Sequence, residues 1–535
     1  MSNPIGRDTL WREIQQVWDV IVIGGGIVGA GVFREAVRAG LKTLLLEAHD
    51  FSSGTSSRSS KMVHGGLRYL KNGQIKLTMD SVHERQRLLQ EGKGLVDPLR
   101  FTLVSYRGDS PPGWVFGLGL IAYDALAMRW NHTSHSISAL KEICPELNEN
   151  RLVGGSSFYD AQTDDARLVL RVIQEGQRAG GTALNYARVA GLMRTQAGKV
   201  CGVQVQDQIG GPTAEIKAGV VINATGAWAD DLRAHVGERP RLRQLRGSHL
   251  IFPREKLPVN DAISFLHPED RRPVFAFSWE GATLVGTTDV DHNESMLTDP
   301  AISRAETDYL MAAVDHVFGC LGLTEKDVRS TMAGIRSVLD TGKADPSKES
   351  RDEILWDEHG LVTITGGKLT MFRHMAQKTL KFARSYLPEH AHFNGSSRAL
   401  NTLDDEALEM LAYQPQMEDA LLLRLLGRYG TAAPSLLDAA HSDELCAAAD
   451  TPTLWAELRW AARTEQVVHL DDLLLRRTRL GSLLANGALN ELARIRLICQ
   501  PELGWDDARW QREEENYRNL WQRAYSLPQK EMQSA

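Results

Sequence analysis

The sequence predicts an α/β fold followed by an all-α part: a Rossmann-like domain interleaved with an antiparallel-sheet domain, and then a helical C-terminal domain. Three observations lead to this class. A glycine-rich turn opens a strand–helix–strand unit near the N-terminus, paired β runs fill the middle of the chain, and the pattern becomes helical after residue 400. A chain of 535 residues exceeds the size of one hydrophobic core, so more than one domain is expected.

The N-terminal unit has the order of a βαβ motif. An apolar, β-branched run, "WDVIVIGGG" (18–26), ends in glycines. A helical segment, "IVGAGVFREAVRAG" (27–40), closes on Gly40, and "LKTLLLEA" (41–48) reads as the next strand. Such a unit implies a parallel sheet.

The rest of the chain divides into a β-rich and a helical part. Glycine and proline separate β runs at 198–207, 216–231, 248–253, 273–289 and 353–367. We expect two interleaved domains within residues 15–400, of which the nucleotide-binding one takes about 15–75, 150–245 and 340–400. Runs such as "EDALLLRLLGRYG" predict a separate helical domain over 401–535.

Composition excludes several classes of protein. The net charge of -7 gives no reason to expect nucleic-acid binding. The chain has five cysteines, which are scattered along the sequence. This argues against a disulfide framework and a thiolate metal site, so no metal is expected, and it favours a reducing compartment. The N-terminus lacks the apolar core of a signal peptide, and no apolar stretch reaches the length of about 18 residues that a membrane span needs.

The glycine turn carries the pattern Gly24-x-Gly26-x-x-Gly29. The first glycine permits a tight turn, the second lets the backbone approach a pyrophosphate at the helix N-terminus, and the third allows close helix–strand packing. An acid at the end of the second strand can accept hydrogen bonds from a ribose diol and would repel a 2′-phosphate. We therefore expect cofactor contacts from the turn and this acid: Gly24, Gly25, Gly26, Ile27, Val28, Gly29 and Glu47.

The turn alone does not separate NAD from FAD, but two later glycine-marked strand ends do. "VVINATGAWADD" leads a strand into Gly226, as in FAD-dependent two-domain oxidoreductases, and "LVTITGGKLT" (361–370) brings Gly366 and Gly367 to another strand end. Three such returns suit a long cofactor lying across the sheet, so FAD is the predicted cofactor.

A hydroxyl-rich stretch, "FSSGTSSRSSKMVHGGLRYL" (51–70), follows Glu47 directly. Hydroxyls and backbone amides there suit a pyrophosphate or the edge of a flavin ring, and an Arg-Tyr pair after a double glycine suits an anionic substrate. The alternative is a solvated serine-rich loop. The predicted cofactor contacts are Thr55, Ser56, Ser57 and Ser60, and the predicted substrate contacts are Arg68 and Tyr69.

At this point the chain resembles a known family, the FAD-dependent, respiratory glycerol-3-phosphate dehydrogenases. The resemblance covers almost the whole chain and depends on ordered motifs: "IVIGGGIVGAG", "TSSRSSKMVHGGLRYL", "YDAQTDDARLVL", "INATGAWADD", "RGSHLIF", "LVGTTD", "AGIRSV" and "TGGKLTMFR". It implies hydride transfer from C2 of sn-glycerol 3-phosphate to FAD, release of dihydroxyacetone phosphate, and electron transfer to membrane quinone. It also implies a cytoplasmic protein peripherally associated with the inner membrane.

The resemblance also implies roles for particular residues. A phosphomonoester needs several cations of fixed geometry. The basic positions of the family pattern match Arg68, Arg336, Arg351 and Lys368, and we assign catalytic roles to His249, Arg336 and Lys368. His249 is the candidate proton acceptor, because a neutral imidazole suits that task. Further contacts are predicted to the substrate from Tyr69 and Thr287, and to the cofactor from Gly367, Leu369 and Thr370, while Asp289 can orient a base or hold a loop.

Alternatives remain open at this stage. The family commonly has proline after the arginine of the "G-I-R" motif, where this chain has Ser337, so another polyol phosphate such as erythritol phosphate is an alternative substrate. An amine or amino-acid oxidase would need one arginine rather than four cations. A non-catalytic flavin-binding sensor would bind FAD without substrate-dependent reduction.

Two segments are candidates for membrane contact. One is the apolar stretch 113–130, which contains terminal tryptophans and reads either as a buried helix or as a segment at a membrane face. The other is the basic helix with Arg476, Arg477 and Arg479. The oligomeric state is left open, and a homodimer is compatible with the sequence.

Overall fold

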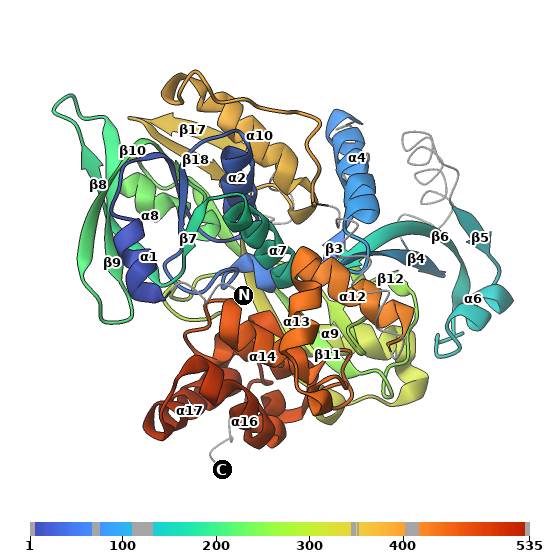
Figure 1. The fold of residues 1–535 in the computed structure, drawn as a ribbon. Coiled ribbons are helices and arrows are strands. Elements are labelled where there is room, and N and C mark those ends of the chain that lie inside the picture. Colours follow the sequence, from blue (N-terminus) through green and yellow to red (C-terminus); the bar gives the residue numbers. More distant parts are fainter. Residues whose placement is uncertain are drawn as a thin grey trace, which may run out of the picture.

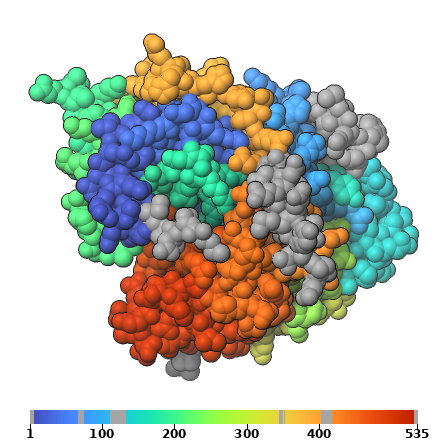
Figure 2. Space-filling model, viewed as in Figure 1, coloured from blue at the N-terminus to red at the C-terminus, as the bar shows by residue number. Residues whose placement is uncertain are grey.

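The computed structural model describes residues 6–66, 75–109, 132–343, 349, 352–401 and 417–529. Within these residues the chain forms two β-sheets and a group of C-terminal helices, which confirms the predicted fold class (Figure 1). The C-terminal helices gather at one end of the molecule, and the space-filling view shows them as one continuous lobe, coloured orange to red (Figure 2).

The first sheet contains the predicted Rossmann-like unit. Its strand order is β17-β18-β10-β1-β2-β7, and all of these neighbours pair in parallel except β17 and β18. Five of the six residues of β1 are apolar and buried, as expected for a strand covered on both faces. The strands are β1 (Trp18–Ile23), β2 (Thr43–Leu46), β7 (Thr182–Leu184), β10 (Thr213–Asn223), β17 (Ile354–Glu358) and β18 (Leu361–Thr365).

Helices cover this sheet and a hairpin extends it. The predicted helix after the glycine turn is α2 (Ile27–Arg38), and it packs against α7 (Asp165–Arg178) and α10 (Phe372–Phe382). The hairpin of β8 (Ala187–Arg194) and β9 (Val200–Asp207) joins β10 in an antiparallel manner. Two shorter helices, α1 (Arg7–Glu13) and α8 (Ala229–Ala234), complete this half (Figure 1).

The second sheet is mainly antiparallel and supplies the other wall of the site. Its path is β15-β11-β14-β13-β12-β4-β6-β3, with β16 beside β11 and β5 beside β6. The strands are β3 (Met62–Val63), β4 (Val96–Tyr106), β5 (Thr133–His135), β6 (Leu152–Thr163), β11 (Leu242–Pro253), β12 (Ala262–Leu266), β13 (Pro273–Trp279), β14 (Ala282–Gly286), β15 (Val290–Asp291) and β16 (Ser330–Leu339). The helices beside it are α4 (Ile75–Glu91), α6 (Ile137–Ile143) and α9 (Arg304–Phe318).

One strand boundary differs from the prediction. The sequence placed a strand start at residue 248, whereas β11 begins at Leu242 and places His249 well inside it. The polar residues Arg243 and Arg246 interrupt the apolar run by which the sequence would indicate a strand. They lie in β11 because it pairs continuously with β16, from Leu242 opposite Leu339 to Ile251 opposite Ser330.

The C-terminal part has a hydrophobic core of its own, built around Trp455, Leu474 and Trp510. Its helices pack on both the first-sheet helix α7 and the second-sheet strand β16. They are α12 (Asp419–Tyr429), α13 (Ala433–Ala439), α14 (Trp455–Thr464), a π-helical segment (Asp472–Arg477), α15 (Leu480–Leu483), α16 (Leu492–Leu503) and α17 (Asp507–Ala524).

The three arginines predicted to face a membrane are buried instead, and that prediction is wrong. Their side chains are at most 4% exposed. Arg476 and Arg477 both bind the buried carboxylate of Asp50, and Arg479 binds Asp164 at 2.8 Å. The sequence shows a cationic helix but not the aspartates, 300 or more residues away, that neutralise it.

The other membrane candidate, residues 113–130, lies outside the described residues. Within the part of the chain that the structure describes, none of the helices combines the length and apolarity needed to cross a bilayer.

The Asp50 cluster leads to a stability prediction. Burial alone would raise the pKa of Asp50, but Arg477 and Arg476 lower it to about 2, so the carboxylate is ionised. Asp50→Asn leaves two buried guanidiniums short of a counterion, which should cost about 3–5 kcal/mol of folding free energy. The midpoint of thermal unfolding measures the loss. Asp507→Asn, which removes the partner of the exposed Arg496, is the control and should change that midpoint little; equal effects of the two changes would contradict the prediction.

Candidate functional site

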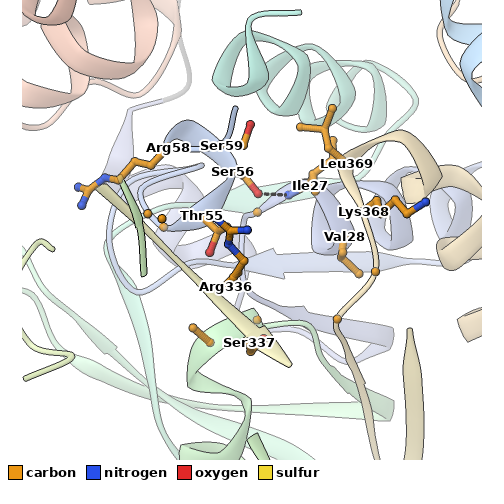
Figure 3. A pocket seen from close by; sticks show the side chains of 18 of the residues that line it. Ile27, Val28, Thr55, Ser56, Arg58, Ser59, Arg336, Ser337, Lys368 and Leu369 are labelled. Carbon is orange, nitrogen blue, oxygen red and sulfur yellow. Dashed lines mark hydrogen bonds between the residues drawn. The ribbon is translucent and has the colours of Figure 1, made fainter. Parts of the chain in front are cut away.

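One large cavity lies between the two sheets, with a volume of about 1780 Å³. Residues from the C-terminal ends of β1, β10 and β18 line one side, and residues of β11, β13 and β16 line the other. Ordinary small-molecule pockets measure roughly 300–1,000 Å³, so this one has room for a large cofactor together with a substrate. Figure 3 shows the part of the cavity where the glycine turn, the serine-rich loop and β16 meet.

The glycine turn has the geometry that a pyrophosphate site needs. Gly24 has a φ of +108°, and a Cβ on Gly29 would lie 1.8 Å from the Gly24 carbonyl oxygen. The helix α2 therefore starts directly against β1, and its N-cap residue, Gly26, has no side chain. Ser56 Oγ accepts a hydrogen bond from the Ile27 amide at 3.0 Å (Figure 3). A helix N-terminus with its dipole, and a hydroxyl beside it, suit a phosphate.

Glu47 directly follows β2, beside this turn, and lines the cavity. Its carboxylate accepts hydrogen bonds from the amides of Gly25 at 2.6 Å and His49 at 2.9 Å. Burial raises its pKa, and the two backbone donors oppose that shift. A carboxylate has about four acceptor positions, so two remain for the hydroxyls of a ribose.

The structure brings most of the predicted cofactor residues to the cavity wall. They are Gly24, Gly26, Ile27, Val28, Glu47, Thr55, Ser56, Ser60, Gly226, Gly367, Leu369 and Thr370. Three others shape the site from behind: Gly29 packs on the turn, Gly25 packs against Phe51, and Ser57 lies buried beneath its loop. The predicted substrate residues Arg68, Tyr69 and Arg351 lie outside the described residues.

The described part of the serine-rich stretch, residues 51–66, is a tightly held loop rather than a solvated one. The hydroxyl of Thr55 donates to the carbonyl of Ile335 in β16. The Lys61 ammonium binds Asp165 at 2.7 Å and the Ser57 carbonyl at 2.6 Å, and Ser59 Oγ binds Asp165 at 2.7 Å. Burial lowers the pKa of Lys61 to about 8, although Asp165 acts in the opposite direction. These contacts fix the hydroxyls that face the cavity.

His249 lies at the cavity wall with its ring fully buried. Its Nε2 is 2.9 Å from Ser60 Oγ, so the loop and β11 meet at this hydrogen bond. Burial, followed by the positive charges of Lys61 and Arg336, lowers the pKa of His249 to about 3. The imidazole is therefore neutral at physiological pH, which is the form that can accept a proton.

Arg336 stands in β16 and lines the cavity (Figure 3). Its Nη2 is 3.4 Å from both Thr287 Oγ1 and the Thr288 carbonyl, and its Nη1 is 3.7 Å from the buried carboxylate of Asp289. The predicted residues Arg336 and Thr287 are thus in contact.

Two more predicted positions line the cavity near the strand ends. Lys368 extends away from Arg336 in Figure 3, and its Nζ lies 3.3 Å from Ser81 Oγ. The hydroxyl of Ser337 is 3.2 Å from Thr365 Oγ1, so it connects β16 to β18 across the two sheets. A proline at this position would lack that connection.

Several lining residues carried no signal in the sequence. At the end of the cavity nearest β8 are Arg188 and Gln206, which stand in an ordinary hairpin. An apolar wall comes from Phe101, Phe158 and Phe275, which read as core residues. Arg272 precedes β13 in a turn that contains no motif. Only the pairing of strands distant in sequence brings these side chains to the site.

Comparison with known proteins gives the class of this site. Residues 19–373 match the FAD dependent oxidoreductase family, and residues 364–510 match the C-terminal domain of alpha-glycerophosphate oxidase. The chain therefore belongs to the FAD dependent oxidoreductase family, and the glycine turn, the acid after it and the size of the cavity all fit FAD.

Individual relatives narrow the comparison. The chain is 32% identical to a Staphylococcus saprophyticus protein named aerobic glycerol-3-phosphate dehydrogenase, over 89% of each chain, and 32% identical to the Bacillus subtilis protein of that name, over 89% of this chain and 90% of the relative. The crystal structure of a Bacillus halodurans glycerol-3-phosphate dehydrogenase complexed with FAD superposes with a TM-score of 0.79 at 27% identity, covering 99% of this chain and 100% of the other. The resemblance that the motifs predict is confirmed.

The glycine turn gives a prediction about flavin content. Gly29→Ala places a Cβ against a backbone oxygen that cannot move without opening the turn. We expect bound flavin to fall below about a tenth of one per chain, since the pyrophosphate amides lose their alignment. The ratio of flavin to protein absorbance measures it. Gly395→Ala is the control, because its φ is not positive and nothing lies within 4 Å of the new Cβ. Full flavin content in Gly29→Ala would contradict the prediction.

Proposed function

We propose that this protein oxidises sn-glycerol 3-phosphate to dihydroxyacetone phosphate with FAD, and passes the electrons to a membrane quinone. The observation that carries the proposal is the pairing of a cation, Arg336, with a neutral buried histidine, His249, in the cavity of the FAD fold. The names of the relatives point to the same substrate.

The cations account for the phosphate. A phosphomonoester carries nearly two negative charges, and a guanidinium can bind two of its oxygens side by side. Arg336 supplies such a group at the cavity wall, and Lys368 adds a second positive charge at the end of β18. Arg68 and Arg351 remain predicted contributors.

His249 accounts for the proton. When bound, the flavin supplies the two-electron acceptor for the carbon that bears the hydroxyl. Ser60 Oγ holds the His249 ring in place at Nε2, and the neutral imidazole takes the hydroxyl proton. The pKa of about 3 reflects burial and two neighbouring cations. A bound phosphate offsets those cations and so raises the basicity of the imidazole when substrate is present.

Anaerobic reduction of the purified flavoprotein tests the substrate. We would add sn-glycerol 3-phosphate, glycerol and erythritol phosphate to separate samples and follow the visible flavin band. Bleaching with the first alone is the expected result. Bleaching with erythritol phosphate alone would keep the mechanism and reassign the substrate, in line with the polar Ser337 at the cavity wall. A flavin that no polyol phosphate reduces would overturn the proposal and favour an amine oxidase or a sensor.

The proton-acceptor role predicts a kinetic effect at His249. His249→Gln keeps a hydrogen-bonding side chain but removes the base, so the rate of flavin reduction should fall by about 10²–10⁴-fold. Because the pKa lies near 3, the free enzyme should show no loss of kcat/KM from His249 protonation between about pH 5 and 8. Rapid-mixing spectroscopy measures the rate, and a reduction rate within threefold of the parent would rule out the role.

The proposed quinone acceptor lies in a membrane, so the proposal includes a site of membrane attachment. We propose peripheral attachment at the inner membrane through apolar surface that includes the segment 113–130. The three arginines that the sequence predicts for this role are buried, so attachment should not depend on them. Co-sedimentation with membranes should therefore persist in about 1 M salt, where the screening length falls to about 3 Å. Full release by salt would contradict apolar attachment, and full recovery in the supernatant at low salt would contradict attachment altogether.

A further inference from the structure

We propose that Asp289 and Arg272 are positioning residues that hold the Arg336 guanidinium in place for the phosphate of the substrate. The three residues form an Arg–Asp–Arg chain, which we call the Asp289 relay. The inference rests on the proposed function in its choice of substrate, and it adds two residues to which that function gives no role.

The geometry of the relay is specific. The Asp289 carboxylate is fully buried and lies between the two guanidiniums. Its Oδ2 is 3.1 Å from Arg272 Nη2, and its Oδ1 is 3.7 Å from Arg336 Nη1. Arg272 also donates through Nη1 to the Asp289 carbonyl at 3.1 Å, so it holds the backbone and the side chain of Asp289 together.

Three separate elements of the second sheet supply the relay. Arg336 stands in β16, Asp289 lies between β14 and β15, and Arg272 lies just before β13. The central strand β11 pairs with both β15 and β16, so Leu245 is opposite Asp291 on one side and Arg336 on the other. The Arg336 side chain must cross β11 to reach Asp289.

Gly247 leaves room for this crossing. A Cβ on Gly247 would lie 1.9 Å from Arg336 Nη2 and 2.8 Å from Thr287 Oγ1. Its φ is not positive, so the backbone does not require glycine here. The absence of a side chain at Gly247 therefore gives the Arg336 guanidinium the room to cross the strand.

The charges of the relay explain why it binds an anion. One carboxylate faces two guanidiniums, so the relay retains a net positive charge at the cavity wall. The Arg336 side chain is about a quarter exposed and that of Arg272 about a third, whereas that of Asp289 is fully buried. An ion pair with a buried carboxylate orients a guanidinium without neutralising the whole group, which suits recognition of a dianion.

A matched pair of variants tests the relay. Asp289→Asn keeps the shape of the side chain and removes its charge. Asp291→Asn, two residues away, removes the partner of Arg243 in a more exposed ion pair and is the control. We expect Asp289→Asn to raise KM for sn-glycerol 3-phosphate by about 10- to 100-fold, with a smaller change in kcat and unchanged flavin content. The control should keep KM within about twofold.

Two further variants separate positioning from folding. Gly247→Ala meets the flexible end of Arg336 rather than backbone, so it should raise KM in the same way while the flavin content stays unchanged. Arg272→Gln should also raise KM. Arg272→Lys keeps the charge and should therefore raise KM less. If Asp289→Asn fails to fold, the Arg272 pair and Gly247→Ala decide the question: raised KM supports the relay, and parental KM in all three overturns it.

Binding of inorganic phosphate to the oxidised holoenzyme keeps this test independent of the proposed substrate. The change in the flavin spectrum on titration gives the dissociation constant without turnover. Weaker phosphate binding in Asp289→Asn and Gly247→Ala supports the relay even if glycerol 3-phosphate fails to reduce the parent, in which case only the proposed function falls. Equal phosphate binding by parent and both variants, or an equal loss in Asp291→Asn, would overturn the relay.

Discussion

The carboxylate of Asp165 is the point on which the site depends. It stands at the start of α7 and binds the Lys61 ammonium, the Arg479 guanidinium, and the amide and hydroxyl of Ser59. These partners come from the serine-rich loop and from the C-terminal helical part. A single buried anion therefore fixes the loop that faces the cofactor cavity, and through Ser60 it fixes the position of His249.

Buried ion pairs of this kind supply specificity more than stability. Removing charges from water costs nearly as much free energy as the attraction returns, so an apolar core of the same shape would often be equally stable. An apolar contact can slide, however, whereas an arginine between two aspartates has one arrangement that satisfies its hydrogen bonds. Arg479, with Asp164 and Asp165, is such a case, and it lies directly behind the loop that carries the cavity hydroxyls. Precise placement of those hydroxyls is what flavin chemistry needs.

The sequence predicted the part of this structure that local patterns control. The glycine turn, Glu47 and the strand ends at Gly226 and Gly367 were found because each combines a strand with a backbone requirement that only certain residues meet. The start of β11 and the burial of Arg476 could not be predicted in this way. Both depend on partners far along the chain, β16 in one case and Asp50 in the other.

The anions of the first-sheet half have their counterions in another part of the chain. Arg476, Arg477 and Arg479 neutralise Asp50, Asp164 and Asp165 from beyond residue 470. A chain cut near residue 400 would lose these arginines, and of the cations named here only Lys61 would remain beside Asp165. The helical part therefore completes the charge balance of the dinucleotide-binding fold. That balance is reached only when the last quarter of the polypeptide has been made.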